Sequence, residues 1–266
     1  MAKSSDVAQK RPRKLWWLVG CMVFMLMVIV QMPASWLLDK YAADNRYVQY
    51  VSGNLWQGSL VWQLPSGNTA LTGAGTWTWQ PWQLLLGTVG ADVELQSGQT
   101  RLSGEARIHR QGWQVENMDG KIAPETLRQW VSWQLPDAPI QANNVRLSYQ
   151  KADEGRAAGF DEADGQLTWV GGMLGYPKGG QYMYLTLPPM HAQLSAVQKD
   201  AQSRLHMQLL DNQDKRLGDI YLDGTQMLDI SLTQRLLEQM PSYQGKAPQD
   251  TNVVNVRQPI TQLGAR

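Results

Sequence analysis

Residues 91–108 read ADVELQSGQTRLSGEARI, and apolar and polar side chains alternate through both halves of this stretch. Ala91, Val93 and Leu95 alternate with polar residues up to a turn at residues 97–99, and residues 100–108 continue the alternation after it. A period of two is typical of antiparallel strands that present one face to a core and the other to water. This stretch therefore predicts two half-buried strands joined by a tight turn.

The same alternation recurs on both sides of this stretch. It is present around residues 76–80, 145–149, 167–169, 194–196, 205–209 and 220–222. Short strands that repeat every 10–15 residues or so indicate an antiparallel, mainly β fold rather than βαβ units. We expect a sandwich, an open barrel or a long curved sheet, with few short helices.

Helix and loop signals are sparse. Pro124 is suited to the first turn of a helix that carries Leu127, Trp130 and Val131 and ends near Pro136. A capping-box pattern at Ser231 and Gln234 predicts a second helix over residues 232–240, before Pro241. Residues 151–164 are charged and rich in Gly and Ala, which predicts a surface loop. The polar residues 241–266 predict a flexible tail.

The N-terminus has the charge pattern of a membrane anchor. Residues 1–14 contain five basic residues and one acidic residue, residues 15–30 contain no charge, and apolar residues resume at 32–38. About 20 apolar residues in a helix cross the hydrocarbon core of a bilayer. We expect a basic cytoplasmic tail (1–14), a transmembrane anchor (15–38), an exported β-rich domain (39–240) and the tail (241–266), because basic flanks stay in the cytoplasm. Trp16, Trp17 and Trp36 lie near the ends of the anchor, where interfacial aromatic residues are enriched.

Two alternatives to a permanent anchor are weighed. A cleaved signal peptide has the same basic flank, but its apolar region is 7–15 residues or so and ends in an A-x-A-like site, which residues 32–36 match poorly. The sequence before Cys21 reads like a lipoprotein box, but nine apolar residues follow Cys21, where a lipoprotein has none. The sequence therefore matches a permanent anchor better than either alternative.

The sequence carries few signals of chemistry. One Cys and three scattered His exclude a multi-Cys metal site and the His-x-x-x-His pattern, and the net charge of +1 gives no basic field for nucleic acid. No nucleophile elbow or phosphate-binding loop is present. His109, His191 and His206 are expected to be solvated, and the acidic residues at 161, 162 and 164 lack the spacing of a calcium loop. We expect no cofactor, no metal and no enzyme activity.

Several short motifs, taken in order, resemble those of the type II (general) secretion pathway protein N family. Residues 31–38 resemble the family's membrane exit, residues 52–58 its Gly-x-(Leu/Val)-Trp-x-Gly turn, residues 77–87 its Trp-rich strand and Leu-Leu-x-Gly segment, residues 135–147 its hairpin, and residues 165–175 its late Gly-x-Leu-x-Trp block. The residues that carry these motifs are Pro33, Trp36, Gly53, Trp56, Gly58, Trp77, Trp79, Pro81, Trp82, Gly87, Gly165, Trp169 and Gly175.

The resemblance implies an accessory subunit of the machine that exports folded proteins across the outer membrane of a Gram-negative bacterium. Such a subunit is single-pass in the inner membrane, keeps its bulk in the periplasm, contacts other secretion subunits and has no catalytic residues. The alternative is an anchored protein that binds lipid in an apolar β-groove, and a periplasmic enzyme ranks third. We expect Trp56, Trp77 and Trp79 to be core residues, with Gly53 and Gly58 forming a tight turn, and residues 84–87 to form one helical turn.

Overall fold

The structure is a computed structural model that describes residues 13–36, 47–66, 69–80, 88–128, 134–153, 157–178, 181–199, 202–239 and 243–259. The helices are α1 (Arg13–Val30), α3 (Pro124–Arg128) and α4 (Gln234–Leu237). The strands are β1 (Val48–Gly53), β2 (Gln57–Ser66), β3 (Thr69–Trp79), β4 (Val89–Ser97), β5 (Thr100–His109), β6 (Gly112–Ile122), β7 (Ile140–Gln150), β8 (Gly159–Trp169), β9 (Gly172–Lys178), β10 (Gln181–Leu187), β11 (Met190–Lys199), β12 (Gln202–Asp211), β13 (Arg216–Leu222), β14 (Met227–Thr233) and β15 (Asn252–Pro259).

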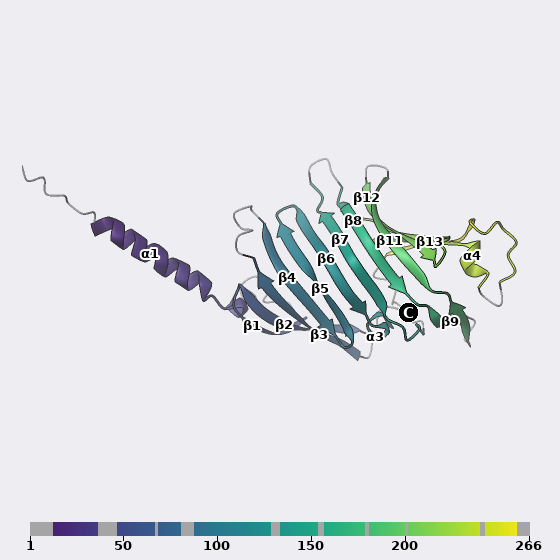
Figure 1. Cartoon of the computed structure of the whole chain (residues 1–266), viewed down its shortest axis with the longest axis horizontal. Helices are drawn as coiled ribbons and strands as arrows, with labels where there is room; N and C mark the ends of the chain where they lie inside the picture. The colour runs from purple at the N-terminus through teal and green to yellow at the C-terminus, as the bar shows by residue number, and fades with distance from the viewer. Residues whose placement is uncertain are drawn as a thin grey trace, which may run out of the picture.

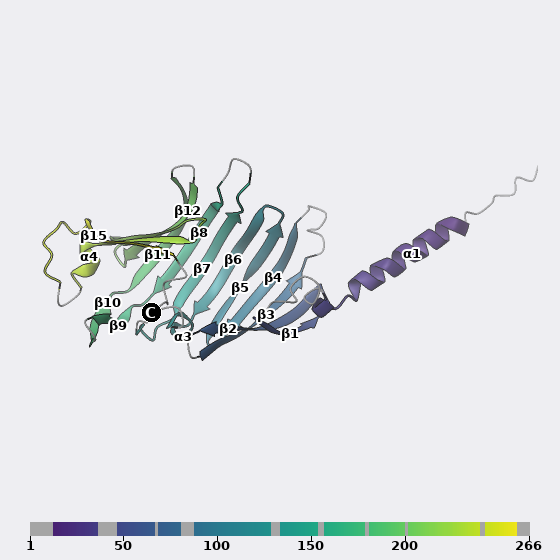
Figure 2. The same cartoon turned by 180° about the vertical axis from the view of Figure 1, so that it is seen from behind.

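Thirteen strands form one antiparallel sheet in which neighbours in space are neighbours in sequence, except where β8 pairs with β11. The two strands in between, β9 and β10, form a separate hairpin at the lower margin of the sheet in Figure 1. Helix α1 projects from the end where β1 lies, and α4 lies at the opposite end (Figures 1 and 2). Among the folds considered, a long curved sheet is therefore the one observed, and the prediction of a mainly β, antiparallel fold is confirmed.

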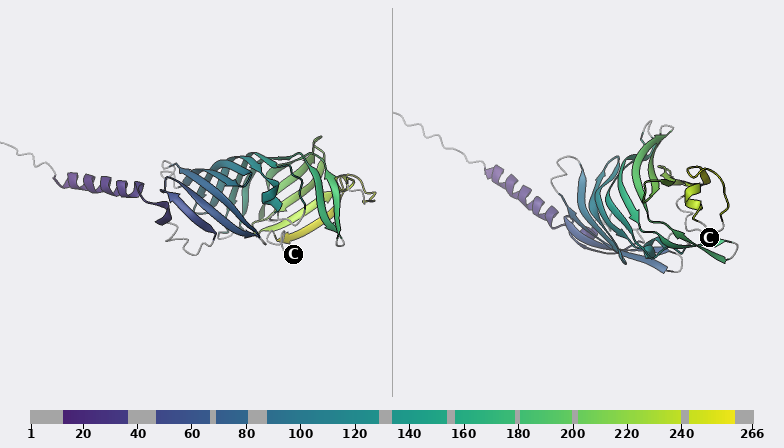
Figure 3. Two further views of the ribbon diagram at one scale, coloured as in Figure 1. Left: turned by 90° about the horizontal axis from the view of Figure 1, so that it is seen from below. Right: turned by 45° about the vertical axis from the view of Figure 1, so that its right-hand side comes forward.

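The sheet curls toward one face, as the two views in Figure 3 show. The hydroxyl of Tyr149 in β7 donates a hydrogen bond of 3.3 Å to the carbonyl of Gly224, which follows β13. Three strands separate β7 from β13 in the sheet, so a flat sheet would hold them about 19 Å apart. A tyrosine side chain cannot bridge that distance, and the face that carries Tyr149 is therefore concave.

The buried core lies on this concave face, in the part of the sheet from β5 to β13. Its centre is Phe160 of β8, whose ring meets Tyr149 and Trp113 edge to face at centroid distances of 5.4 and 6.4 Å. The other buried members come from β7, β11 and β12: Ala142, Val145, Leu194 and Leu205. Among the residues whose burial is described, strands β1 to β4 contribute no member of this cluster, so the first four strands are less tightly packed than the middle of the sheet.

The short helices follow the sequence signals only in part. Helix α3 begins at Pro124, as predicted, although Trp130 and Val131 lie outside the described residues. The predicted capping box at Ser231 is wrong: Ser231 lies inside β14, and α4 begins at Gln234 with Thr233 as its N-cap. Residues 227–233 form β14, which pairs with β13 on one side and with β15 on the other. This pairing overrides the local helix signal.

Two segments that were predicted to be irregular contain strands. The predicted loop at 151–164 overlaps β8, which begins at Gly159 and pairs with β7. The predicted tail at 241–266 contains β15, which forms the edge of the sheet against β14. Charge with Gly and Ala in the first segment, and polar side chains in the second, were the reason for both predictions. On a sheet with one face in water, polar side chains are ordinary outward-facing residues.

Helix α1 ends at Val30, and the chain is helical again at residues 34–36, after an interruption at residues 31–33. Among the described residues, no helix has the length and apolarity required to cross a bilayer.

Candidate functional site

The turn between β1 and β2 is the first motif region that the structure places. Gly53 has φ of +90° and pairs with Gly58 at the end of the hairpin. Between them the side chain of Asn54 accepts hydrogen bonds from the backbone N–H groups of Trp56 and Gln57, at 3.0 and 2.8 Å. Only glycine adopts such a φ without strain. The predicted tight turn at Gly53 and Gly58 is therefore present.

This turn brings three tryptophans together. The rings of Trp56 and Trp79 stack at a centroid distance of 4.7 Å, and the indole N–H of Trp77 donates to the carbonyl of Leu55 at 3.2 Å. A Cβ atom on Gly58 would lie 2.3 Å from the Trp77 ring, so the ring occupies the space that this glycine leaves. All three indoles are half-buried and lie outside the buried cluster. They line the sheet near its first turn rather than fill the closed core that was expected.

The chain that leaves α1 is bonded to the same turn. Pro33 forms a bridge with Asn54, and the backbone N–H of Leu55 donates to the carbonyl of Met32 at 3.2 Å. Trp36 follows three residues later and is 45% exposed. The motif residues Pro33, Gly53, Trp56, Gly58, Trp77 and Trp79 thus gather at one end of the sheet, whereas Pro81, Trp82, Gly87 and the predicted helical turn at 84–87 lie outside the described residues.

The later motif residues lie elsewhere, in the second half of the sheet. Gly165 has φ of +116° and lies at the β7–β8 register shift, where a Cβ would approach the Val145 Cα to 2.7 Å. The indole of Trp169 donates to the Ala138 carbonyl at 3.0 Å, and Gly175 exchanges two backbone hydrogen bonds with Gln134. The structure does not join these residues to the first group, so the motifs form two separate structural units.

An uninterrupted apolar row crosses all thirteen strands of the sheet. Each residue is the direct cross-strand partner of the next, and every one is apolar or glycine: Val51, Leu60, Gly75, Leu95, Leu102, Gly120, Ala142, Leu167, Ala192, Leu209, Gly218, Leu232 and Val254. We call this set the apolar row. Twelve strand spacings give it a length of about 58 Å along the sheet.

The apolar row lies on the concave face and is only partly covered. Leu102, Leu167 and Ala142 belong to or pack against the buried cluster that includes Tyr149. The larger side chains of the row are half-buried, and that of Leu95 is 38% exposed. A contiguous apolar surface that stays partly open to solvent is typical of an interaction surface.

Along one side of the apolar row, the residue next to each of its members faces the convex side and is polar. These polar residues are Ser52, Ser59, Thr76, Glu94, Ser103, Asp119, Asn143, Gln166, Gln193, Gln208, Asp219, Ser231 and Asn255. A strand that alternates in this way buries one face and hydrates the other. Along these two rows the sheet is therefore amphipathic on all thirteen strands.

A side-chain network on the convex face was missed by the sequence reasoning. Nε2 of His206 lies 2.8 Å from Oδ1 of Asp219, Nδ1 lies 3.3 Å from the Ser195 hydroxyl, and the imidazole stacks on Tyr221 at 4.5 Å. Arg216 binds the other oxygen of Asp219. The prediction of solvated histidines is wrong for His206, whose side chain is 15% exposed, and for His191, which is equally covered and lies 3.2 Å from Asp214.

This network resembles a Ser-His-Asp triad in composition but is built as a ladder across the sheet. Ser195 and His206 are direct partners on β11 and β12, and Asp219 lies on β13. The Asp219 carboxylate is already neutralised by Arg216, which also reaches Asn252 of β15 at 2.8 Å. The network joins β11, β12, β13 and β15, and the only sequence signal for it was that each residue sits on the polar phase of its strand.

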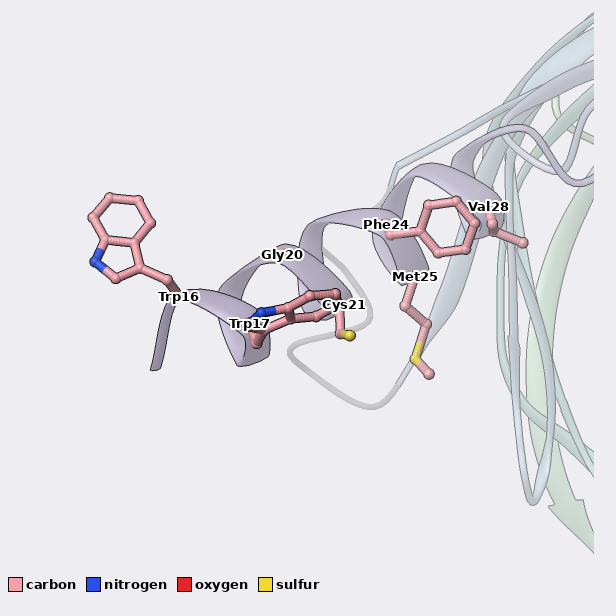
Figure 4. Close-up of a pocket in the computed structure, with 7 residues that line it drawn as sticks. All are labelled: Trp16, Trp17, Gly20, Cys21, Phe24, Met25 and Val28. Atoms are coloured by element: carbon pink, nitrogen blue, oxygen red, sulfur yellow. The ribbon is translucent and has the colours of Figure 1, made fainter. Parts of the chain in front are cut away.

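Neither of two prominent concavities in the described part of the chain contains this network. The first runs along one side of α1, where Trp17, Cys21 and Met25 follow one another and are exposed in the described part of the chain (Figure 4). The second, of about 670 Å³, lies between the β9–β10 hairpin and the segment after α3, with Arg128, Pro136, Met173 and Tyr184 among its walls. Within the described residues no group of three or more metal-ligating side chains is present.

Comparison with known families decides the identity of the chain. A model of the family described as type II secretion system (T2SS), protein N, matches residues 46–250. The chain belongs to the type II secretion system protein N family. The match begins just before β1 and ends just before β15, so it covers the sheet from its first strand to its penultimate one.

Membership of the protein N family makes this chain an accessory subunit of the type II secretion system. It also fits what was inferred from the short motifs, because all of those from Gly53 to Gly175 fall inside the matched range. Neither the curated proteins nor the solved structures gave a match to the chain.

Proposed function

We propose that this protein N chain is a membrane-anchored, non-enzymatic subunit that supports the export of folded proteins from the periplasm through protein–protein contacts. The observation that carries the proposal is the family match, which covers the sheet from β1 to β14. The family implies the accessory role, whereas the surface of α1 supports the anchor and the convex face of the sheet supports the contacts.

Helix α1 supports the anchor through its surface. From Leu18 to Val28 its described side chains are apolar or small and exposed, and no strand covers them. Its 16 uncharged residues, 15–30, span about 24 Å as a helix, and a bilayer adapts to such a short segment by local thinning. The basic residues before Leu15 would then remain in the cytoplasm and place the sheet in the periplasm.

The convex face of the sheet supports a contact role rather than catalysis. It carries hydroxyl, amide and charged side chains across every strand, and its Ser195–His206–Asp219 network is held as a cross-strand ladder. Such a surface offers many hydrogen-bonding groups to protein partners. In this proposal the partners are other secretion subunits.

A secretion assay tests this function. A strain without the gene is expected to retain its secreted hydrolases in the periplasm, and the full-length chain is expected to restore secretion. A chain with α1 replaced by a cleavable signal peptide should be exported but fail to restore secretion. Normal secretion by the deletion strain would refute the role in export, whereas full rescue by the anchorless chain would refute only the need for the anchor.

A second candidate function, the binding of lipid acyl chains, is favoured by one specific observation. The apolar row presents no polar side chain over about 58 Å of the concave face, which suits hydrocarbon better than a protein partner that needs a polar rim. Leu95 is the exposed member of the row, and Gln96 beside it points to the convex face and is also exposed.

These two neighbours give a matched test of lipid binding. The Leu95→Glu variant should lose phospholipid that co-purifies with the chain, as measured by mass spectrometry, because a carboxylate in an acyl-chain path is strongly unfavourable. The Gln96→Glu variant adds the same charge to the opposite face and should retain the lipid. Equal lipid content in the wild type and both variants would exclude the apolar row as the binding surface.

A further inference from the structure

The first three strands differ in charge from the rest of the sheet. Residues 47–91, which include β1, β2 and β3, contain no Asp, Glu, Lys or Arg, and the first charged residue after them is Asp92 in β4. On the convex face these three strands present Ser52, Ser59 and Thr76, whereas the next strand presents Glu94. The sheet is therefore neutral at one end and charged beyond it.

The same neutral strands, together with the β1–β2 turn, hold four tryptophans. Trp56, Trp77 and Trp79 surround the β1–β2 turn, and Trp62 covers Gly73, where a Cβ would lie 2.1 Å from its ring. On the edge strand β1, Tyr50 is 64% exposed. Tryptophan and tyrosine combine an apolar ring with one polar group, and both are enriched where a bilayer meets water.

The backbone fixes this end of the sheet next to α1. The hydrogen bond from Leu55 to Met32 and the bridge between Pro33 and Asn54 lie within three residues of the end of α1 at Val30. Ala34, which follows directly, is buried. If α1 spans the bilayer, the β1–β2 turn has to lie at the membrane surface (Figure 1).

We infer that β1, β2 and β3 form a membrane-seating surface that lies in the headgroup region of the bilayer that holds α1. This inference rests on the anchoring proposed above. Where the headgroups meet the acyl chains a charged side chain loses hydration, whereas hydroxyl, amide and indole groups exchange hydrogen bonds with headgroups and water. The absence of charge over 45 residues and the exposed tyrosine on the edge strand both follow from such a seat. A seat at this end also opens the apolar row toward the acyl chains.

A depth-dependent quenching experiment on the full-length chain tests the inference. The single native cysteine, Cys21, lies on α1 and takes an environment-sensitive fluorophore directly, which reports on the anchor. In a Cys21→Ser background, Gln57→Cys places the probe at the β1–β2 turn. Gln213→Cys is the matched control, because both glutamines are exposed, lie at a hairpin turn or directly beside one, and have a backbone N–H that is bonded to a preceding Asn or Asp side chain.

The three labelled chains are reconstituted in vesicles of phosphatidylcholine and phosphatidylglycerol with or without lipid that carries a quencher just below the headgroup. The probes at Cys21 and at position 57 should each lose about half or more of their emission to quenching lipid, and the probe at position 213 should be unaffected. If position 57 is not quenched while Cys21 is, the seat is refuted and the anchor stands. If Cys21 is not quenched either, the anchor fails and the seat fails with it. A blue-shifted, unquenched probe at position 57 would indicate a protein contact and would also refute the seat.

Discussion

Gly58 determines whether the tryptophan group at the first turn can form. The Trp77 ring and the Ser52 carbonyl oxygen would lie 2.3 and 2.6 Å from a Cβ at this position. Gly75 lies on the partner strand β3, two residues before Trp77. The atom closest to a Cβ at Gly75 is the flexible Leu95 Cδ2, at 3.3 Å. The two glycines therefore differ in the room that they leave for a methyl group.

Gly58→Ala is expected to destabilise the chain by about 1–3 kcal/mol, because the methyl group would displace a ring and a backbone carbonyl. Gly75→Ala should cost clearly less, since only a leucine methyl has to move. Urea unfolding of both variants in the same detergent would measure the difference. A Gly58→Ala variant as stable as Gly75→Ala would show that Trp77 does not need the space.

Asp223 fixes the turn between β13 and β14. Burial raises the pKa of Asp223, but hydrogen bonds from the Thr225 hydroxyl and from the backbone N–H groups of Met227 and Thr225 outweigh burial, so the pKa lies below its ordinary value of 3.8. A lowered pKa in the folded state means that the carboxylate stabilises the fold above the unfolded pKa and loses this contribution as pH falls through the folded pKa.

The stability of the wild type should therefore decrease as pH falls from about 5 to below 3.8, and the Asp223→Asn variant should lose less stability over the same range. Asn keeps an oxygen acceptor for the turn but has no charge to lose. Urea midpoints measured at several pH values would compare the two slopes. Parallel slopes would mean that other carboxylates determine the acid sensitivity.

At the scale of elements, β15 protects the edge of the sheet. It pairs with β14 from Met227 to Thr233, and Asn252 at its start receives a hydrogen bond from Arg216 of β13. The loop before it is fixed by Gln234, whose side chain donates to the Gly245 carbonyl and accepts from the Tyr243 hydroxyl. β15 is itself an edge strand, but it carries Arg257 and Pro259, which discourage pairing with another chain. Without β15 the more apolar β14 would become the edge and a better template for self-association.

Removal of residues 252–266 should therefore lower the stability and produce concentration-dependent oligomers, as measured by light scattering after size-exclusion chromatography in detergent. Removal of residues 260–266 alone leaves β15 complete and should change neither property. If the longer truncation remained at the size of the full-length chain at every concentration, β15 would not act as an edge cover.

For the whole molecule, the buried cluster lies toward the C-terminal part of the sheet. Phe160, Leu194 and Leu205 are buried there, whereas, among the residues whose burial is described, β1 to β4 add nothing to the cluster. Local opening costs least where few apolar contacts are buried. The sheet is thus expected to have a firm half and a looser half joined by continuous pairing.

Hydrogen exchange measured by mass spectrometry should show the slowest backbone exchange in β7, β8, β11 and β12 and faster exchange in β1 and β2 for the detergent-solubilised chain. In vesicles, the exchange of β1 and β2 should slow further if the membrane seat forms, while β7 and β8 should not change. Uniform protection along all thirteen strands would contradict this gradient.

The strand pattern and the family were accessible from the sequence alone, because both are local properties of the chain. The alternation at 91–108 predicts β4 and β5, and Pro124 predicts the start of α3. The order of short motifs was sufficient for the resemblance that the family match confirms. Where the local signal was misleading, as at Ser231, pairing with neighbouring strands overruled it.

Only the tertiary structure decided which residues on different strands meet. The contact of His206 with Asp219, the continuity of the apolar row and the incorporation of β15 all depend on strand register, which is set by pairing between segments distant in sequence. The curvature of the sheet also depends on contacts between distant segments, since the hydrogen bond from Tyr149 to Gly224 joins residues 75 positions apart. The sequence determined that each strand has an apolar and a polar face, and register then aligned those faces along the apolar row.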